Sequence, residues 1–143
     1  MANKFENVNR CKQIAEELER YVNGVYYRCS ECGDVFTWDD VEVKDDECYY
    51  CPHCGDMILE GDLEQCSVYD WPADVLDVEY RCGSKSDYRS VRIMVAFGGP
   101  NIFVDTASKQ VELYWWTETA SYPISSSAAE ALDEWAEEHW NCL

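Results

Sequence analysis

Positive charge is scarce in this chain of 143 residues. Lysine and arginine total 11 against 29 aspartate and glutamate residues, so the formal net charge is −18. A protein that grips DNA or RNA needs many cations facing the phosphates, and this balance excludes that mode of binding. The chain is not disordered either, because 47% of its residues are hydrophobic and 14% are aromatic. Acidic disordered chains are poor in both classes, so we expect a folded core beneath the one-sided charge.

Long apolar runs are also missing. No stretch approaches the roughly 18 to 20 apolar residues that a membrane-spanning helix needs. Residues 1–20 carry mixed charge and lack the apolar centre of a signal peptide. We therefore expect a cytoplasmic protein.

Histidines and recognisable catalytic motifs are rare. The only histidines are His53 and His139, and no G-x-S-x-G, H-E-x-x-H or Walker pattern occurs. Carboxylates are abundant, but their spacing singles out no pair for acid–base chemistry. The sequence predicts no catalytic residue and a non-enzymatic protein, with a small hydrolase as the third-ranked alternative.

Cysteine, in contrast, is plentiful at nine residues. Disulfides are rare in the cytosol, so another use is needed for them. Cys29-x-x-Cys32 precedes Cys51-x-x-Cys54 with 18 residues between the pairs, which is the spacing of a four-cysteine zinc site. Four thiolates saturate a tetrahedral ion, so we expect one structural Zn²⁺ bound by these four cysteines.

The second pair has an alternative register, because Cys48-x-x-Cys51 has the same spacing. Gly33 and Gly55 each follow the second cysteine of a pair, and glycine permits the positive φ that such a turn often needs. This match favours Cys54 over Cys48, although the replacement of Cys54 by Cys48 stays open. His53, inside the second pair, is interpreted as facing solvent.

The pattern of apolar residues indicates an α+β fold. Helical spacing predicts an N-terminal helix over residues 3–22, and Ser127-x-x-Glu130 predicts a capping box that opens a C-terminal helix packed on a sheet. Between them, alternation predicts an antiparallel meander of three to four strands. The expected organisation is an N-terminal helix packing on the C-terminal domain (1–24), a zinc ribbon (25–64) and an α+β domain (65–143).

The negative charge is concentrated in the expected ribbon. Residues 31–64 carry 12 acidic side chains and one lysine, a net charge of −11. One interpretation is a solvated face that keeps the protein soluble. The other is a surface for a basic protein partner, with carboxylates about as dense as the phosphates of a duplex. The candidate partner-binding residues are Asp39, Asp40, Glu42, Asp45, Asp46, Glu47, Asp56, Glu60, Asp62 and Glu64.

Aromatic side chains form a second candidate surface. In a strand over 111–116, alternation places Trp115 on the inner face and Tyr114 and Trp116 on the other. That other face, shared with Phe103 and Arg92, is either covered by other elements or an exposed contact patch. Tyr114 and Trp116 are therefore candidate contact residues.

Two resemblances extend this interpretation. The paired knuckles resemble the zinc-ribbon class over residues 25–60, which implies its fold and metal. The run Val91-Arg92-Ile93-Met94-Val95-Ala96-Phe97-Gly98-Gly99-Pro100-Asn101-Ile102, continuing to Tyr114-Trp115-Trp116, resembles small uncharacterised proteins of phages and conjugative elements of gut bacteria.

The second resemblance implies an anti-defence role in the cytoplasm of a bacterial host. In that role the protein is an anti-restriction or anti-CRISPR inhibitor whose acidic surface acts as a DNA mimic in the basic groove of a nuclease complex. The alternative is a zinc-ribbon adaptor that binds a protein through its aromatic sheet face.

Overall fold

The computed structural model describes residues 4–59, 63–71 and 75–143, and its described part is α+β, with two helices and antiparallel sheets. Helix α1 spans Lys4–Val22 and α2 spans Ser126–Trp140. Neither described helix has the length and apolar character needed to cross a membrane. Residue 3, the expected start of this helix, lies outside the described residues. The helix ends as predicted, with Gly24 at a φ of +69°.

The largest sheet has five strands in the order β10-β9-β8-β7-β6, so each strand pairs with its neighbour in the chain. Their bounds are Asp77–Cys82 (β6), Tyr88–Ala96 (β7), Asn101–Asp105 (β8), Gln110–Trp115 (β9) and Glu118–Pro123 (β10). The prediction of three to four strands was wrong because β10 went unnoticed. That strand alternates small or polar residues and carries little apolar signal.

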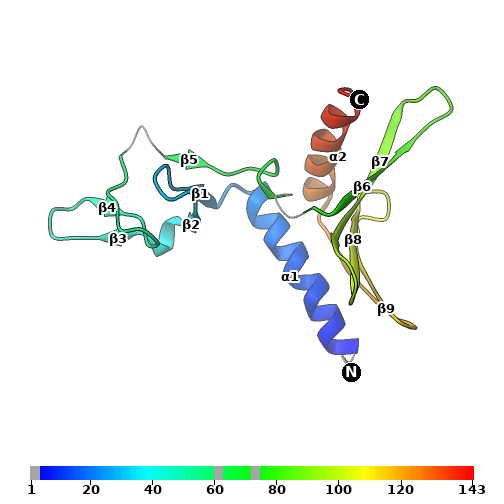
Figure 1. Cartoon of the computed structure of the whole chain (residues 1–143), viewed down its shortest axis with the longest axis horizontal. Coiled ribbons are helices and arrows are strands. Elements are labelled where there is room, and N and C mark those ends of the chain that lie inside the picture. The colour runs from blue at the N-terminus through cyan, green and yellow to red at the C-terminus, as the bar shows by residue number, and fades with distance from the viewer. Residues whose placement is uncertain (1–3, 60–62, 72–74) are drawn as a thin grey trace.

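Both helices pack on the same face of this sheet (Figure 1). Val91, Ile93 and Val111 point from the sheet into the core and are fully buried. Leu18 of α1 and Leu132 of α2 meet them and are also 0% exposed. The amphipathic stripes predicted for the two helices therefore cover one apolar sheet face.

The opposite face of the sheet is open, since no described helix lies over it (Figure 1). Trp115 packs against the core as predicted, and Tyr114 lies on the open face. Trp116 does not share that face, because β9 ends at Trp115. Its φ of +56° places it in the turn to β10, where it is 90% exposed. The alternation rule stops applying where the strand stops.

The cap of α2 also differs from the prediction. Ser125, and not Ser127, is the N-cap, and its Oγ accepts a hydrogen bond of 3.0 Å from the backbone N–H of Ala128. Ser125 Oγ donates in turn to Glu19 of α1 at 2.7 Å. One hydroxyl therefore caps α2 and links it to α1.

The cysteine module (residues 25–64) projects from this α+β body (Figure 1). Its strands are Tyr26–Arg28 (β1), Val35–Thr37 (β2), Glu42–Val43 (β3), Tyr49–Tyr50 (β4) and Glu64–Gln65 (β5), with a 3₁₀ turn at Trp38–Asp40. They form a β2-β1-β5 sheet and a β3-β4 hairpin. Its small core consists of Cys29, Phe36 and Cys51.

Candidate metal centre

Two turns of the same geometry present the cysteines of the module. The N–H of Gly33 donates to the carbonyl of Cys29 at 2.9 Å, and the N–H of Gly55 donates to that of Cys51 at 3.0 Å. Both glycines have a φ of +78°, a conformation that other L-residues adopt only with strain. The positive φ therefore explains why glycine follows the second cysteine of each pair, as the sequence indicated.

The four sulfur atoms lie within 4.8 Å of one another. The Sγ atoms of Cys29 and Cys54 are 3.7 Å apart, and those of Cys32 and Cys51 are 3.9 Å apart. A tetrahedral ion with Zn–S bonds of about 2.3 Å places its ligands about 3.8 Å apart. The geometry therefore fits a metal ion held by four thiolates, with no position left for a substrate.

The ionisation of the thiols also favours a cation. Backbone hydrogen bonding at Cys32 lowers the pKa of the Cys29 thiol to about 7. At Cys54 a backbone hydrogen bond from Asp56 lowers the pKa, but desolvation and the neighbouring thiols outweigh it and raise the pKa to about 12. Four thiolates this close repel one another, so full ionisation requires a positive ion among them.

Cys48 and His53 lie outside the group of four. The thiol of Cys48 donates to the carbonyl of Asp46, 3.7 Å away. The His53 ring is exposed, with Nε2 3.0 Å from the carbonyl oxygen of Val35, and its backbone N–H donates to Cys51 Sγ at 3.4 Å. Of the two registers, the described structure brings together the one that contains Cys54.

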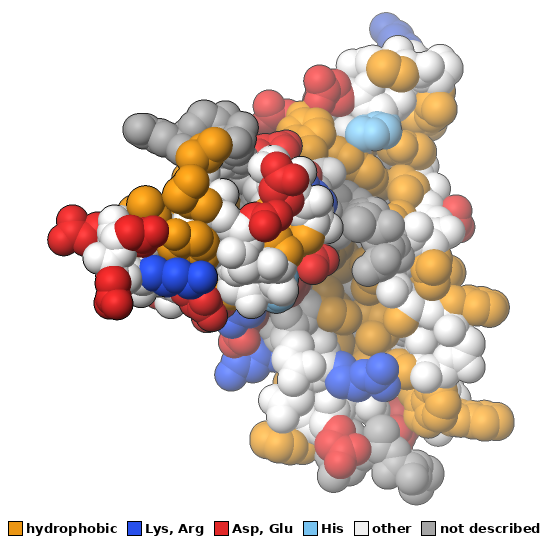
Figure 2. Space-filling view, turned by 60° about the vertical axis from the view of Figure 1, so that its left-hand side comes forward, with side chains coloured by type: hydrophobic (Ala, Val, Ile, Leu, Met, Phe, Trp, Pro, Cys, Tyr) orange, Lys and Arg blue, Asp and Glu red, His pale blue; other side chains and the backbone are white. Residues whose placement is uncertain are grey.

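The acidic candidates of the module lie on its surface. Glu60 and Asp62 fall outside the described residues, and the other eight are all exposed. Among the described residues, none of these eight forms an ion pair within 4.0 Å. Carboxylates dominate the charged groups on the face of the module that comes forward in Figure 2. This charge is therefore not neutralised by ion pairing within the described chain.

One of these carboxylates has a fixed orientation. Asp46 accepts a hydrogen bond of 2.6 Å from the Tyr50 hydroxyl and one of 3.0 Å from the backbone N–H of Cys48. The hydrogen bond from Tyr50 is the largest cause that lowers the pKa of Asp46. The turn between β3 and β4 is therefore an ordered acidic loop.

Exposed apolar side chains accompany the charge, a feature that the sequence analysis missed. Val43 and Tyr49 are opposite each other in the β3–β4 pair and are 62% and 42% exposed. The ring of Trp38 lies 4.9 Å from that of Tyr49. The positions of Val43 and Tyr49 could have indicated this surface, because cross-strand neighbours in so short a hairpin share one face. The module surface is therefore acidic and aromatic together.

On the open sheet face, Tyr114 belongs to a cluster of side chains. The guanidinium of Arg92 lies 3.9 Å from the ring centre of Phe103 and 5.9 Å from that of Tyr114. The Tyr114 hydroxyl donates to Glu112 at 2.7 Å. The two candidate contact aromatics thus differ in their environment: Tyr114 contacts Arg92 and Glu112, while Trp116 is exposed to solvent.

Comparison with models of known protein families, with curated proteins and with solved structures finds no match for this chain. The cysteine cluster and the surface chemistry are therefore the basis for any functional conclusion.

Proposed function

We propose that this protein is a non-enzymatic binding protein that holds one structural Zn²⁺ and presents an acidic surface to a basic protein partner. Cys29, Cys32, Cys51 and Cys54 are the zinc ligands. The observation that carries the proposal is the set of eight exposed carboxylates without ion pairs around this centre.

The zinc ion gives the acidic surface its rigidity. Among the described residues of the module, three are buried in its core, too few to fold so small a unit without help. Metal binding supplies folding free energy in such modules, and four sulfur ligands are typical of Zn²⁺. Carboxylates on a rigid scaffold bind without the entropic cost of ordering a disordered acidic tail.

The partner that fits this surface is a protein with a groove built for nucleic acid. Such a groove presents cations at the spacing of phosphates, and a rigid array of carboxylates competes for them. Long-range attraction also raises the rate of encounter. We propose that the partner is a host-defence nuclease complex, of the restriction or CRISPR type, and that binding inhibits DNA cleavage.

The test is inhibition of DNA cleavage by a panel of purified restriction and CRISPR nuclease complexes, measured at several salt concentrations. We expect inhibition of at least one complex, with an inhibition constant that rises steeply with salt and with competing duplex DNA. Absence of inhibition across the panel, or inhibition that does not change with salt, overturns the proposal.

A matched pair of variants separates the local surface from net charge. The triple variant Asp39→Asn, Asp45→Asn, Glu47→Gln removes three carboxylates from the module. The control replaces exposed Glu130, Glu134 and Glu137 of α2 with Gln, the same change in charge. We expect the first to weaken inhibition about tenfold or more and the control to leave it nearly unchanged. Equal losses from both variants contradict a local contact surface.

The adaptor function is the second candidate, and the exposure of Trp116 (90%) and Phe97 (72%) favours it. Large exposed apolar side chains of this kind mark protein interfaces. If the adaptor function is the true one, Trp116→Ala abolishes partner binding. The charge-neutralised module then binds as well as the original protein, at any salt concentration.

A further inference from the structure

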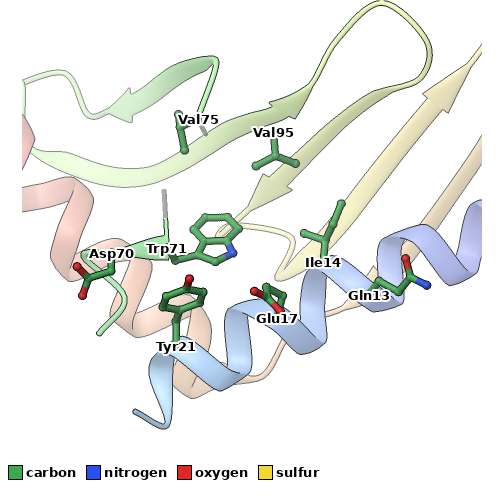
Figure 3. Close-up of a pocket in the computed structure, with 8 residues that line it drawn as sticks. All are labelled: Gln13, Ile14, Glu17, Tyr21, Asp70, Trp71, Val75 and Val95. Atoms are coloured by element: carbon green, nitrogen blue, oxygen red, sulfur yellow. The ribbon is translucent and has the colours of Figure 1, made fainter. Parts of the chain in front are cut away.

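A pocket of about 450 Å³ lies between α1 and the large sheet (Figure 3). Ile14 lines it from α1, and Val75 and Val95 line it from the sheet side. The segment before β6 contributes Trp71, whose ring stands between these two walls in Figure 3. The volume falls in the range of small-molecule sites, and the walls are largely apolar.

The helix places a carboxylate and a phenol beside these apolar walls. Ile14, Glu17 and Tyr21 follow one another at spacings of three and four residues, so they share one face of α1. All three line the pocket. Burial raises the pKa of the Tyr21 hydroxyl, and the negative charge of Glu17 raises it further. The negative charge of Glu17 therefore lies close to the partly buried ring of Tyr21.

Glu17 has one oxygen atom available to a ligand. Its Oε2 accepts the Tyr26 hydroxyl at 3.0 Å and an N–H of Arg20 at 3.4 Å. In the part of the chain that the structure describes, no group donates to Oε1. In the second carboxylate of the pocket, Asp70, both oxygens already have a partner: Oδ1 accepts from Arg28 and Oδ2 from the backbone N–H of Ser67.

The two aromatic rings complete the site. The indole N–H of Trp71 and the hydroxyl of Tyr21 form no hydrogen bond to the described protein, and both side chains are only partly buried. In Figure 3 the two rings lie next to each other beside Glu17. Aromatic faces attract a cation electrostatically, and more strongly where water is excluded.

We propose that this pocket binds a small organic cation, an ammonium or guanidinium group carried on an apolar body. The charged group pairs with Glu17 Oε1 and lies against the rings of Tyr21 and Trp71. The apolar body packs on Ile14, Val75 and Val95. No lysine or arginine lines the described pocket, whereas the carboxylate of Glu17 does, and this charge favours a cation over an anion. The site is independent of the acidic surface of the cysteine module.

The test uses phenethylammonium as the probe and 2-phenylethanol as its uncharged counterpart of similar shape. Binding is followed by NMR through the indole N–H resonances, with the Trp71 signal assigned from the Trp71→Phe variant. We expect a saturable shift of the Trp71 signal with the ammonium. The affinity for the alcohol should be lower by about tenfold or more. Equal affinity for the two, or no saturable shift at Trp71, overturns the proposal.

Three variants separate the pocket from the general attraction of an acidic protein for cations. Glu17→Gln is expected to weaken ammonium binding about tenfold, whereas Glu16→Gln, the same change on the exposed side of α1, leaves it unchanged. Tyr26→Phe removes the hydroxyl that holds Oε2 but keeps the charge of Glu17, so it retains binding. Equal losses in Glu16→Gln and Glu17→Gln would show non-specific attraction and refute the site.

Discussion

Arg81 and Asp105 form a bidentate ion pair on the open face of the large sheet. Nη1 of Arg81 donates to Oδ1 of Asp105 at 2.9 Å, and Nη2 donates to Oδ2 at 2.6 Å. Asp105 is only 4% exposed and also accepts the backbone N–H groups of Ala107 and Ser108. This carboxylate therefore joins the end of β8 both to the edge strand β6 and to the turn that follows it.

The ion pair predicts a pH dependence of stability. Burial by itself raises the pKa of Asp105, but the hydrogen bonds from Arg81, Ser108 and Ala107 outweigh it and lower the pKa below its ordinary value. A lowered pKa gives stability that is present above about pH 4 and is lost as the pH falls through the folded-state value. Asp105→Asn should cost about 2–3 kcal/mol at pH 7 in urea unfolding and make stability less sensitive to pH below 4.

The exposed pair of Asp87 and Arg89 supplies the control for this prediction. Asp87→Asn should leave the free energy of unfolding at pH 7 unchanged, because ion pairs in full contact with water contribute little. If Asp87→Asn and Asp105→Asn had equal effects, the buried pair would not be the source of the acid sensitivity.

Loss of one sulfur ligand should remove the metal and unfold the module. Cys51→Ser deletes the most buried ligand, at 1% exposed, while Cys48→Ser removes a thiol that lies outside the cluster. We expect elemental analysis to find about one Zn²⁺ per chain in the original protein and in Cys48→Ser, and almost none in Cys51→Ser. Metal loss in Cys48→Ser but not in Cys54→Ser would reverse the ligand assignment.

Gly99 should not tolerate a side chain. A Cβ atom added to it would lie 2.4 Å from Cζ3 of Trp115 and 2.8 Å from Cη2 of the same ring. Gly99→Ala should therefore cost about 1–3 kcal/mol, because the indole must leave its packed position. Combining it with Trp115→Leu should cost less than the sum of the two single changes. Strict additivity in thermal unfolding would show that the contact is not the cause.

The cap of α2 gives a prediction in which two nearby serines differ. Ser125→Ala should destabilise the protein by about 1 kcal/mol or more, because it removes the N-cap and the hydrogen bond to Glu19. Ser127→Ala, the change at the residue that the sequence pattern favoured, should have almost no effect. Chemical unfolding of the two variants distinguishes them directly.

The sequence predicted those features that depend on local spacing. Two Cys-x-x-Cys-Gly turns place the ligands through their own backbone, so the four cysteines needed no knowledge of the rest of the fold. The helical spacing of apolar residues, among them Cys11 and Leu18, predicted α1 in the same way. Both are fully buried.

Features that depend on the partner of a segment were not predictable in this way. β10 has little apolar signal of its own and is a strand because β9 pairs with it at every residue from Glu118 to Pro123. Trp116 was misplaced because its left-handed backbone conformation is a property of the turn, not of a strand pattern. The cation pocket likewise joins α1 to residues near position 71, which no local motif connects.

The hydrogen bond between the N–H of Cys66 and the carbonyl of Tyr26, 2.8 Å long, places the two ends of the cysteine module side by side. Because its two ends meet, the module could be replaced by a short turn without changing the path of the remaining chain. The cysteine module is thus an insertion into the α+β body. Grafting this module into a surface turn of another protein would transfer the acidic surface together with the four-cysteine group.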